Sequence, residues 1–134
     1  MMFNTYFWII LAFLFTIPYS AISQIQLGGD LDGETLLDQS GWAVSMSDDG
    51  NRLAVGAPNN PVNGEESGHI RVYEWANGGW NQMGQDIDGR IRFDETGYAV
   101  SLSQDGTFLA AGSSERDPRV FEWLNGAWVQ RGAN

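Results

Sequence analysis

The stretch that decides the fold is Gly41–Ala57, which reads GWAVSMSDDGNRLAVGA. Its large apolar residues at positions 42, 44 and 46 alternate with smaller residues, which is the pattern of a half-buried β-strand. Asp49-Gly50 supplies the positive-φ turn that a short hairpin needs. Leu53 and Val55 continue the alternation beyond this turn. The stretch therefore predicts two antiparallel strands joined by a tight turn.

The same hairpin occurs a second time. Residues 97–113 read GYAVSLSQDGTFLAAGS, and each position lies 56 residues after its match, as 97 does after 41. The segments 27–33 (LGGDLDG) and 83–89 (MGQDIDG) align at the same spacing. The loop at 58–68 in the first copy is shortened in the second, to 113–117, and beyond it the spacing falls to 48, as 119 lies after 71. Loops tolerate such deletions, so the chain is an internal repeat.

Each copy is predicted to contain four short strands joined in series. RVYEW at 71–75 matches RVFEW at 119–123, and Asn77-Gly78 and Asn125-Gly126 each mark a second hairpin turn. The predicted strands are 41–47, 52–57, 69–76 and 79–87 in the first copy, and 97–103, 107–112, 118–124 and 127–132 in the second. A repeated four-stranded antiparallel unit of about 40–50 residues is typical of a β-propeller blade.

We therefore predict an all-β fold with two four-stranded antiparallel β-propeller blades, an incomplete propeller, after an N-terminal signal peptide. The blade repeats span about 32–87 and 88–134, with a leftover strand at 25–31. Propellers use about 4–8 blades, so we expect further blades in the full-length protein. We expect the apolar hairpin residues to lie between or beside the sheets: Trp42, Val44, Met46, Leu53, Val55, Tyr98, Val100, Leu102, Leu109 and Ala111.

The composition excludes several classes of function. The 134 residues include 17 acidic and 7 basic ones, all seven of them arginine, for a formal charge of −10. This balance argues against nucleic acid as a partner, because phosphate binding needs a basic surface, and against adsorption to anionic membranes. The chain has no cysteine, which excludes disulfides, thiolate metal sites and a cysteine nucleophile.

The first 23 residues are predicted to be a secretory signal peptide. They carry no charge, contain an apolar run from Tyr6 to Ile17, and end in Ala21-Ile22-Ser23, small enough for signal peptidase. The alternative is a transmembrane anchor, but the run is shorter than the roughly 18–20 residues that span a bilayer. The mature chain 24–134 would then be a partial β-propeller that is secreted or at the cell surface, with no stable membrane anchor.

The hairpin residues resemble the FG-GAP repeats of integrin-α-like propellers, as found in secreted bacterial surface proteins. GWAVS at 41–45 and GYAVS at 97–101 stand where this family has its FG-x-S-V strand, and Gly56-Ala57-Pro58 matches its GAP element. The resemblance implies a β-propeller and an extracellular setting. The family's Ca²⁺ loop is not carried over, because the turns here are too short to supply the six to eight oxygens that Ca²⁺ needs.

Acidic residues gather in the links between predicted units. Two readings are open: a weak site for a cation or cationic ligand, or turn formation and solubility, since Asx side chains cap their own backbone. We favour turn formation and assign no metal and no cofactor. The weak metal candidates are Asp30, Asp32, Asp38, Asp86, Asp88 and Asp94, on the same rim as Glu34, Glu65, Glu66, Glu95, Glu115 and Asp117.

Pairs of tryptophans flank the two Asn-Gly turns. They form the weak candidates for ligand binding, as a stacking platform for a glycan: Trp75, Trp80, Trp123 and Trp128. We favour the alternative that they pack across the hairpin and between units, because each buries a large apolar area.

No catalytic set is predicted. His69 is the only histidine, and any Ser-His-Asp relay would have to use it. Its place at the start of a strand, after a glycine, instead favours a surface or strand-edge position. The chain has no lysine and no G-x-S-x-G, P-loop or H-E-x-x-H motif.

The sequence favours a non-enzymatic extracellular recognition or adhesion module that is part of a larger propeller and binds an unidentified extracellular protein or glycan. Two alternatives stay open. One is an accessory propeller of a secreted carbohydrate-active or other hydrolytic enzyme, and the other is a purely structural surface repeat.

Overall fold

The computed structural model describes residues 24–132, so the predicted signal peptide at 1–23 lies outside the described residues. This part of the chain is all-β and contains no helix that could cross a membrane. Its strands are β1 (Ala43–Met46), β2 (Arg52–Ala57), β3 (His69–Ala76), β4 (Gly79–Gln82), β5 (Ile87–Asp88), β6 (Ala99–Leu102), β7 (Phe108–Gly112), β8 (Arg119–Leu124) and β9 (Ala127–Arg131).

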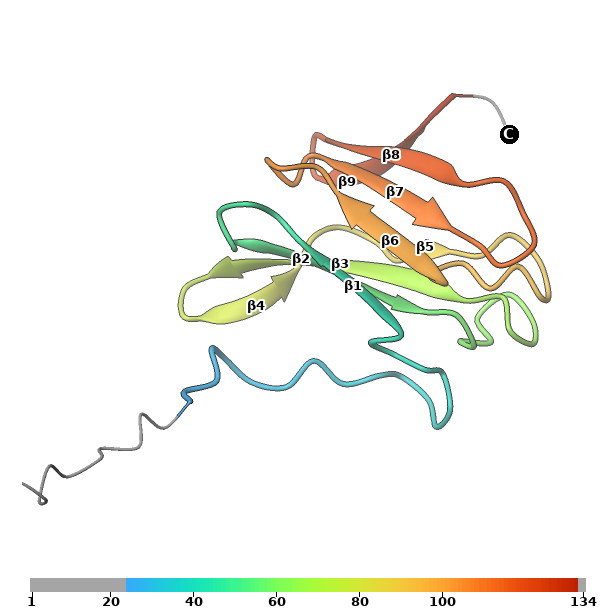
Figure 1. Ribbon diagram of the computed structural model, residues 1–134, viewed down its shortest axis with the longest axis horizontal. Coiled ribbons are helices and arrows are strands. Elements are labelled where there is room, and N and C mark those ends of the chain that lie inside the picture. Colours follow the sequence, from blue (N-terminus) through green and yellow to red (C-terminus); the bar gives the residue numbers. More distant parts are fainter. Residues whose placement is uncertain (1–23, 133–134) are drawn as a thin grey trace, which may run out of the picture.

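The strands form two antiparallel sheets with the same register. The first has the order β1-β2-β3-β4, with β5 also paired to β3, and the second has the order β6-β7-β8-β9. Val44 pairs with Val55 as Val100 pairs with Ala111, and Trp75 pairs with Trp80 as Trp123 pairs with Trp128. The prediction of two repeated antiparallel meanders is therefore confirmed. The two sheets lie against each other without closing into a ring (Figure 1).

Two predicted strands are wrong. The strand predicted at 79–87 ends at Gln82, and Ile87–Asp88 returns as the separate β5 on the same edge of β3. Residues 25–31 form no strand. Both segments contain a glycine with positive φ, Gly84 at 72° and Gly28 at 81°, and this left-handed backbone interrupts an extended strand.

The core lies where opposite faces of the two sheets meet. We call face A the side that carries Val44 in the first sheet and Val100 in the second, and face B the opposite side, with Val72 and Val120 at matching positions. Face B of the first sheet packs on face A of the second. The buried cluster comprises Ala54, Ile70, Val72, Met83, Ile87, Leu109, Ala111, Phe121 and Trp128, with Val100, Leu102 and Trp123 packed against it.

Each sheet therefore has one covered face and one open face. On face A of the first sheet, Val44 is 61% and Met46 52% exposed, whereas their matches Val100 and Leu102 pack into the core. On face B, Val72 is 1% exposed but its match Val120 is 41% exposed. Matching residues thus differ in burial because the neighbouring sheet is present on one side only.

The N-terminal segment 24–40 covers part of the first sheet. In Figure 1 it runs below the first sheet, on the side opposite the second sheet. Trp80 Nε1 donates a hydrogen bond to the carbonyl of Leu27, 3.2 Å away. Trp128 Nε1 makes the equivalent bond to Met83, 3.1 Å away. The segment that leads into each sheet therefore packs on the Trp pair of that sheet.

A backbone seam joins the first sheet to the link that enters the second. In the loop after β2, the carbonyls of Glu65, Glu66 and Ser67 accept hydrogen bonds of 2.9–3.0 Å from backbone N–H groups of residues 93, 95 and 96. A Cβ on Gly56 would overlap the carbonyl oxygen of Gly97. The two backbones approach so closely that no side chain fits between them.

The turns of the two hairpins are closed by their own side chains. Asp49 Oδ1 accepts hydrogen bonds from the hydroxyl of Ser47 and the backbone of Asn51. Asp105 repeats this with Ser103 and Thr107, and these bonds lower the pKa of Asp105 to about 2. These two carboxylates therefore stabilise the hairpin turns in which they lie.

We expect the same substitution to have unequal effects at matching positions of the two units. Val72→Ala removes two methyl groups from the core and should lower the free energy of unfolding by roughly 1.5–3 kcal/mol. Val120→Ala removes the same groups from a partly exposed site and should cost less than about 1 kcal/mol. Urea unfolding of both variants measures the difference. Equal losses would contradict the assignment of covered and open faces.

Candidate functional site

Two of the acidic candidates hold turns together. Asp38 Oδ2 accepts hydrogen bonds from the backbone N–H groups of Glu34 (2.8 Å) and Thr35 (3.2 Å), and its Oδ1 accepts one from Ser40 (2.9 Å). Burial raises the pKa of Asp38, but these three bonds outweigh burial and hold the pKa below its usual value. Asp94, at the matching position, accepts a 2.6 Å bond from the backbone of Arg90. Each of these carboxylates thus stabilises the backbone of the link in which it lies.

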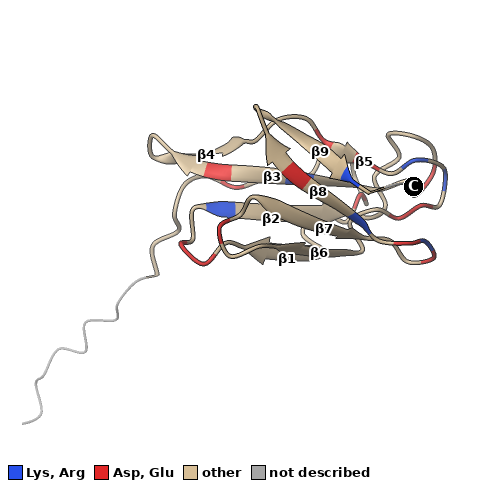
Figure 2. Cartoon of the chain, turned by 90° about the horizontal axis from the view of Figure 1, so that it is seen from above, with Lys and Arg blue, Asp and Glu red and all other residues tan. Residues whose placement is uncertain are grey.

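Asp30, Asp32 and the residues of the predicted acidic rim do not gather into one acidic site. Asp30 and Asp32 are exposed on the N-terminal segment, and Asp30 accepts a hydrogen bond from Gln26. On the predicted acidic rim, Glu65 is paired with Arg92. Figure 2 shows arginines among the acidic residues of the loops at the strand ends. The rim is therefore of mixed charge.

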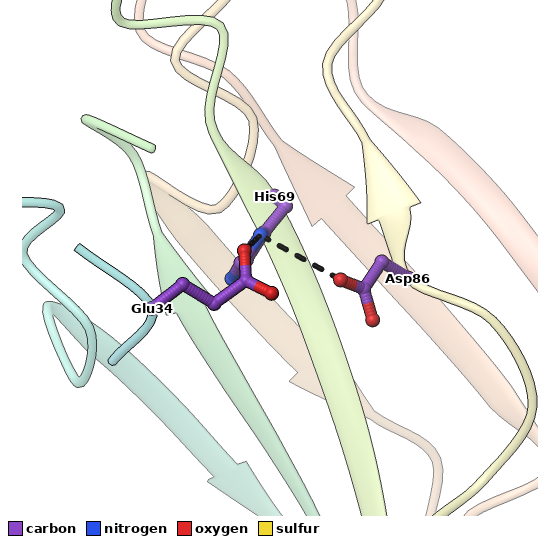
Figure 3. Close-up of side chains that lie close together, drawn as sticks. All are labelled: Glu34, His69 and Asp86. Carbon is purple, nitrogen blue, oxygen red and sulfur yellow. Dashed lines mark ion pairs between the residues drawn. The ribbon is translucent and has the colours of Figure 1, made fainter. Parts of the chain in front are cut away.

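A histidine and two carboxylates converge at one end of face A of the first sheet. His69 begins β3, Glu34 lies on the N-terminal segment, and Asp86 lies between β4 and β5. His69 Nδ1 is 3.7 Å from Glu34 Oε2 and 3.9 Å from Asp86 Oδ2. Figure 3 shows the imidazole between the two carboxylates. Of the six weak metal candidates, only Asp86 belongs to this group.

His69 is buried at the first residue of β3, so of the two predicted positions, surface or strand edge, the surface position is wrong. Its exposed fraction is 3%, and Nδ1 has no hydrogen-bond partner. Burial lowers the pKa of His69, and the charge of Arg71 lowers it further, against the opposing effects of Asp86 and Glu34. The imidazole is therefore neutral near pH 7.

Arg71, two residues after His69 in β3 and on the same face of the sheet, also binds both carboxylates. Its Nε lies 3.1 Å from both oxygens of Asp86, its Nη2 lies 2.9 Å from Asp86 Oδ2, and Nη2 also pairs with Glu34 Oε1. Burial raises the pKa of Asp86, but the bonds from Arg71 and Gln82 lower it below its usual value. Glu34, Asp86 and Arg71 together carry a net charge of −1.

Asp88 lies opposite His69 in the β3–β5 pair. Burial raises its pKa, and the negative charge of Asp86 adds to this effect. Its Oδ1 is buried and has no hydrogen-bond partner. Asp88 therefore adds a second under-satisfied polar group to the same edge of the sheet.

The tryptophan candidates are packing residues in this structure. The ring centroids are 5.3 Å apart both in the Trp75–Trp80 pair and in the Trp123–Trp128 pair. A Cβ on Gly28 would meet the ring of Trp75, and one on Gly84 would meet Trp123. Both pairs therefore contact the preceding segment of the chain, and neither forms a free stacking surface.

No protein-family model matches the sequence, and no curated protein matches it.

We expect the indole N–H to matter more in the second Trp pair than in the first. Trp128→Phe would leave the buried carbonyl of Met83 without a donor and should cost about 1–3 kcal/mol beyond the lost ring area. Trp80→Phe leaves the carbonyl of Leu27, which water can reach, and should cost less than about 1 kcal/mol. Urea midpoints of the two variants test this. A larger loss for Trp80→Phe would contradict the packing roles.

Proposed function

We propose that the chain is a non-enzymatic extracellular recognition or adhesion module that forms part of a larger β-propeller and binds an extracellular protein or glycan. The observation that carries the proposal is the pair of open faces on two units of identical register. Face A of the first unit matches a face that is covered in the second, and face B of the second matches a face that is covered in the first.

The open faces support a setting with more units. In a repeat protein each unit covers its neighbour, and an end unit needs a polar outer face. Here the outer faces are apolar, with Val44 61% and Val129 43% exposed. Further units of the same kind would cover both faces with contacts like those between the two present sheets. The resemblance of the hairpins to FG-GAP repeats is in keeping with this setting.

The non-enzymatic part rests on the residue inventory. One histidine, no cysteine and no lysine leave few ways of activating a nucleophile. The extracellular part rests on the composition of residues 1–23.

We expect the open faces to drive head-to-tail association. Light scattering should show the chain associating as its concentration rises. Val44→Lys blocks one open face and Val120→Lys the other, so each variant alone should be monomeric. A mixture of the two should form a one-to-one dimer, because each variant keeps the face that the other has lost. A wild-type chain that stays monomeric and unfolds in one sharp transition would contradict the proposal.

We also expect no turnover of glycans by the purified chain. Polysaccharides incubated with it should keep their length by chromatography, whether or not an array detects binding. Hydrolysis that is lost in Asp38→Asn would overturn the non-enzymatic assignment, because a pair of carboxylates can cleave glycosides.

A further inference from the structure

We propose that Glu34, His69 and Asp86 form a binding site for a divalent transition-metal ion, with Zn²⁺ as the best match. This inference goes beyond the proposed recognition function and concerns a site inside the first unit.

The distances suit a metal better than direct hydrogen bonds. His69 Nδ1 lies 3.7 and 3.9 Å from the two carboxylate oxygens, which is too far for hydrogen bonds. The three ligand atoms lie within 4.8 Å of one another. Zn²⁺ bonds of 2.0–2.2 Å in a tetrahedron place ligand atoms about 3.3–3.5 Å apart. The two distances from Nδ1 exceed this separation by only a few tenths of an ångström, and side-chain shifts of about an ångström would bring all three atoms around one ion.

The buried imidazole is an independent sign of a missing ligand. His69 is 97% buried, yet Nδ1 faces the two carboxylates without a hydrogen-bond partner. Buried polar atoms are nearly always paired. A cation between the three side chains would give this nitrogen the partner that it lacks.

Arg71 orients both carboxylates: it binds Asp86 Oδ2 at 2.9 Å, and that oxygen keeps a second lone pair for an ion. Arg71 binds Glu34 through Oε1, whereas Oε2 is the atom closest to His69. Asn60 holds Oε2 with a 3.1 Å hydrogen bond. Outer contacts of this kind commonly position metal ligands. Because the group keeps a net charge of −1 with Arg71 included, a divalent cation is attracted to it.

The site is specific to the first unit. The positions that match Glu34 and His69 in the second unit are Arg90 and Asp117, whereas the position that matches Arg71 is again an arginine, Arg119. The arginine is therefore common to both copies of the repeat, whereas the glutamate and the histidine occur only in the first copy. A residue that only maintained the repeated fold would be expected in both copies.

The ligand types select the metal. One imidazole and two carboxylates suit Zn²⁺ and its transition-metal neighbours. Ca²⁺ prefers six to eight oxygen ligands. Three protein ligands leave a fourth position of the tetrahedron for water, which can enter beside Glu34, whose side chain is 40% exposed.

The test uses the tag-free chain, stripped with EDTA, and Zn²⁺ alone as the probe. Because His69 is the only histidine, its two ring nitrogens give unambiguous ¹⁵N signals. One equivalent of Zn²⁺ should shift the Nδ1 signal, and an equal concentration of Ca²⁺ should not. Calorimetry should show one site, weakened at least about 100-fold in His69→Gln and in Glu34→Gln, more than is usual for losing an outer contact. Glu115→Gln, an exposed acidic control, should bind like the wild type.

The outcomes decide the proposal even if His69→Gln does not fold. Glu34 is on the N-terminal segment and not in a strand, so Glu34→Gln and the wild-type ¹⁵N shift suffice. No Zn²⁺ binding, binding without a shift of Nδ1, or binding that Glu34→Gln leaves unchanged would each overturn the site.

Discussion

The arrangement of the two sheets depends on a place where backbone meets backbone with no side chain between. Gly56 faces the carbonyl of Gly97, and Gly68 faces that of Thr96, so closely that any Cβ would overlap. Hydrogen bonds between the loop after β2 and the entering link close this seam. The link leads into β6, which lies beside β1, and there the hydroxyl oxygen of Ser45 accepts a hydrogen bond from the N–H of Leu102, 2.9 Å away. The apolar core lies between the two faces that the seam holds together.

The strands and their register follow from local signals in the sequence. Alternation of apolar residues defines the strands, and Asp-Gly and Asn-Gly turns fix which residues pair. The burial of a given residue does not follow from such signals, because Val72 and Val120 differ only in what lies beyond the sheet. The break at Gly84 was missed for a similar reason. An extended and a left-handed glycine look alike in sequence, and the ring of Trp123, against which Gly84 packs, comes from a distant strand.

The group around His69 could not be assembled from spacing. Glu34, His69 and Asp86 lie on three segments that are far apart in the sequence, and only the folding of the N-terminal segment over face A brings them together. A signal was nevertheless present, since the two copies differ at positions 34 and 69 while both keep the arginine at 71 and 119. The more numerous acidic residues instead indicated the links as the place for a cation. There Asp38 and Asp94 accept hydrogen bonds from their own backbone.

The long loop at 58–68 also makes the two units differ in how each can bind a unit that follows it. Its carbonyls accept the hydrogen bonds of the next link, whereas the corresponding loop at 113–117 is much shorter. The loop after β2 of the first unit therefore forms the hydrogen bonds that fix the next unit. The shorter loop of the second unit cannot form the same bonds. An engineer who extended this protein by duplicating units would have to copy the first, because a tandem of second units would lack the part that fixes the joint.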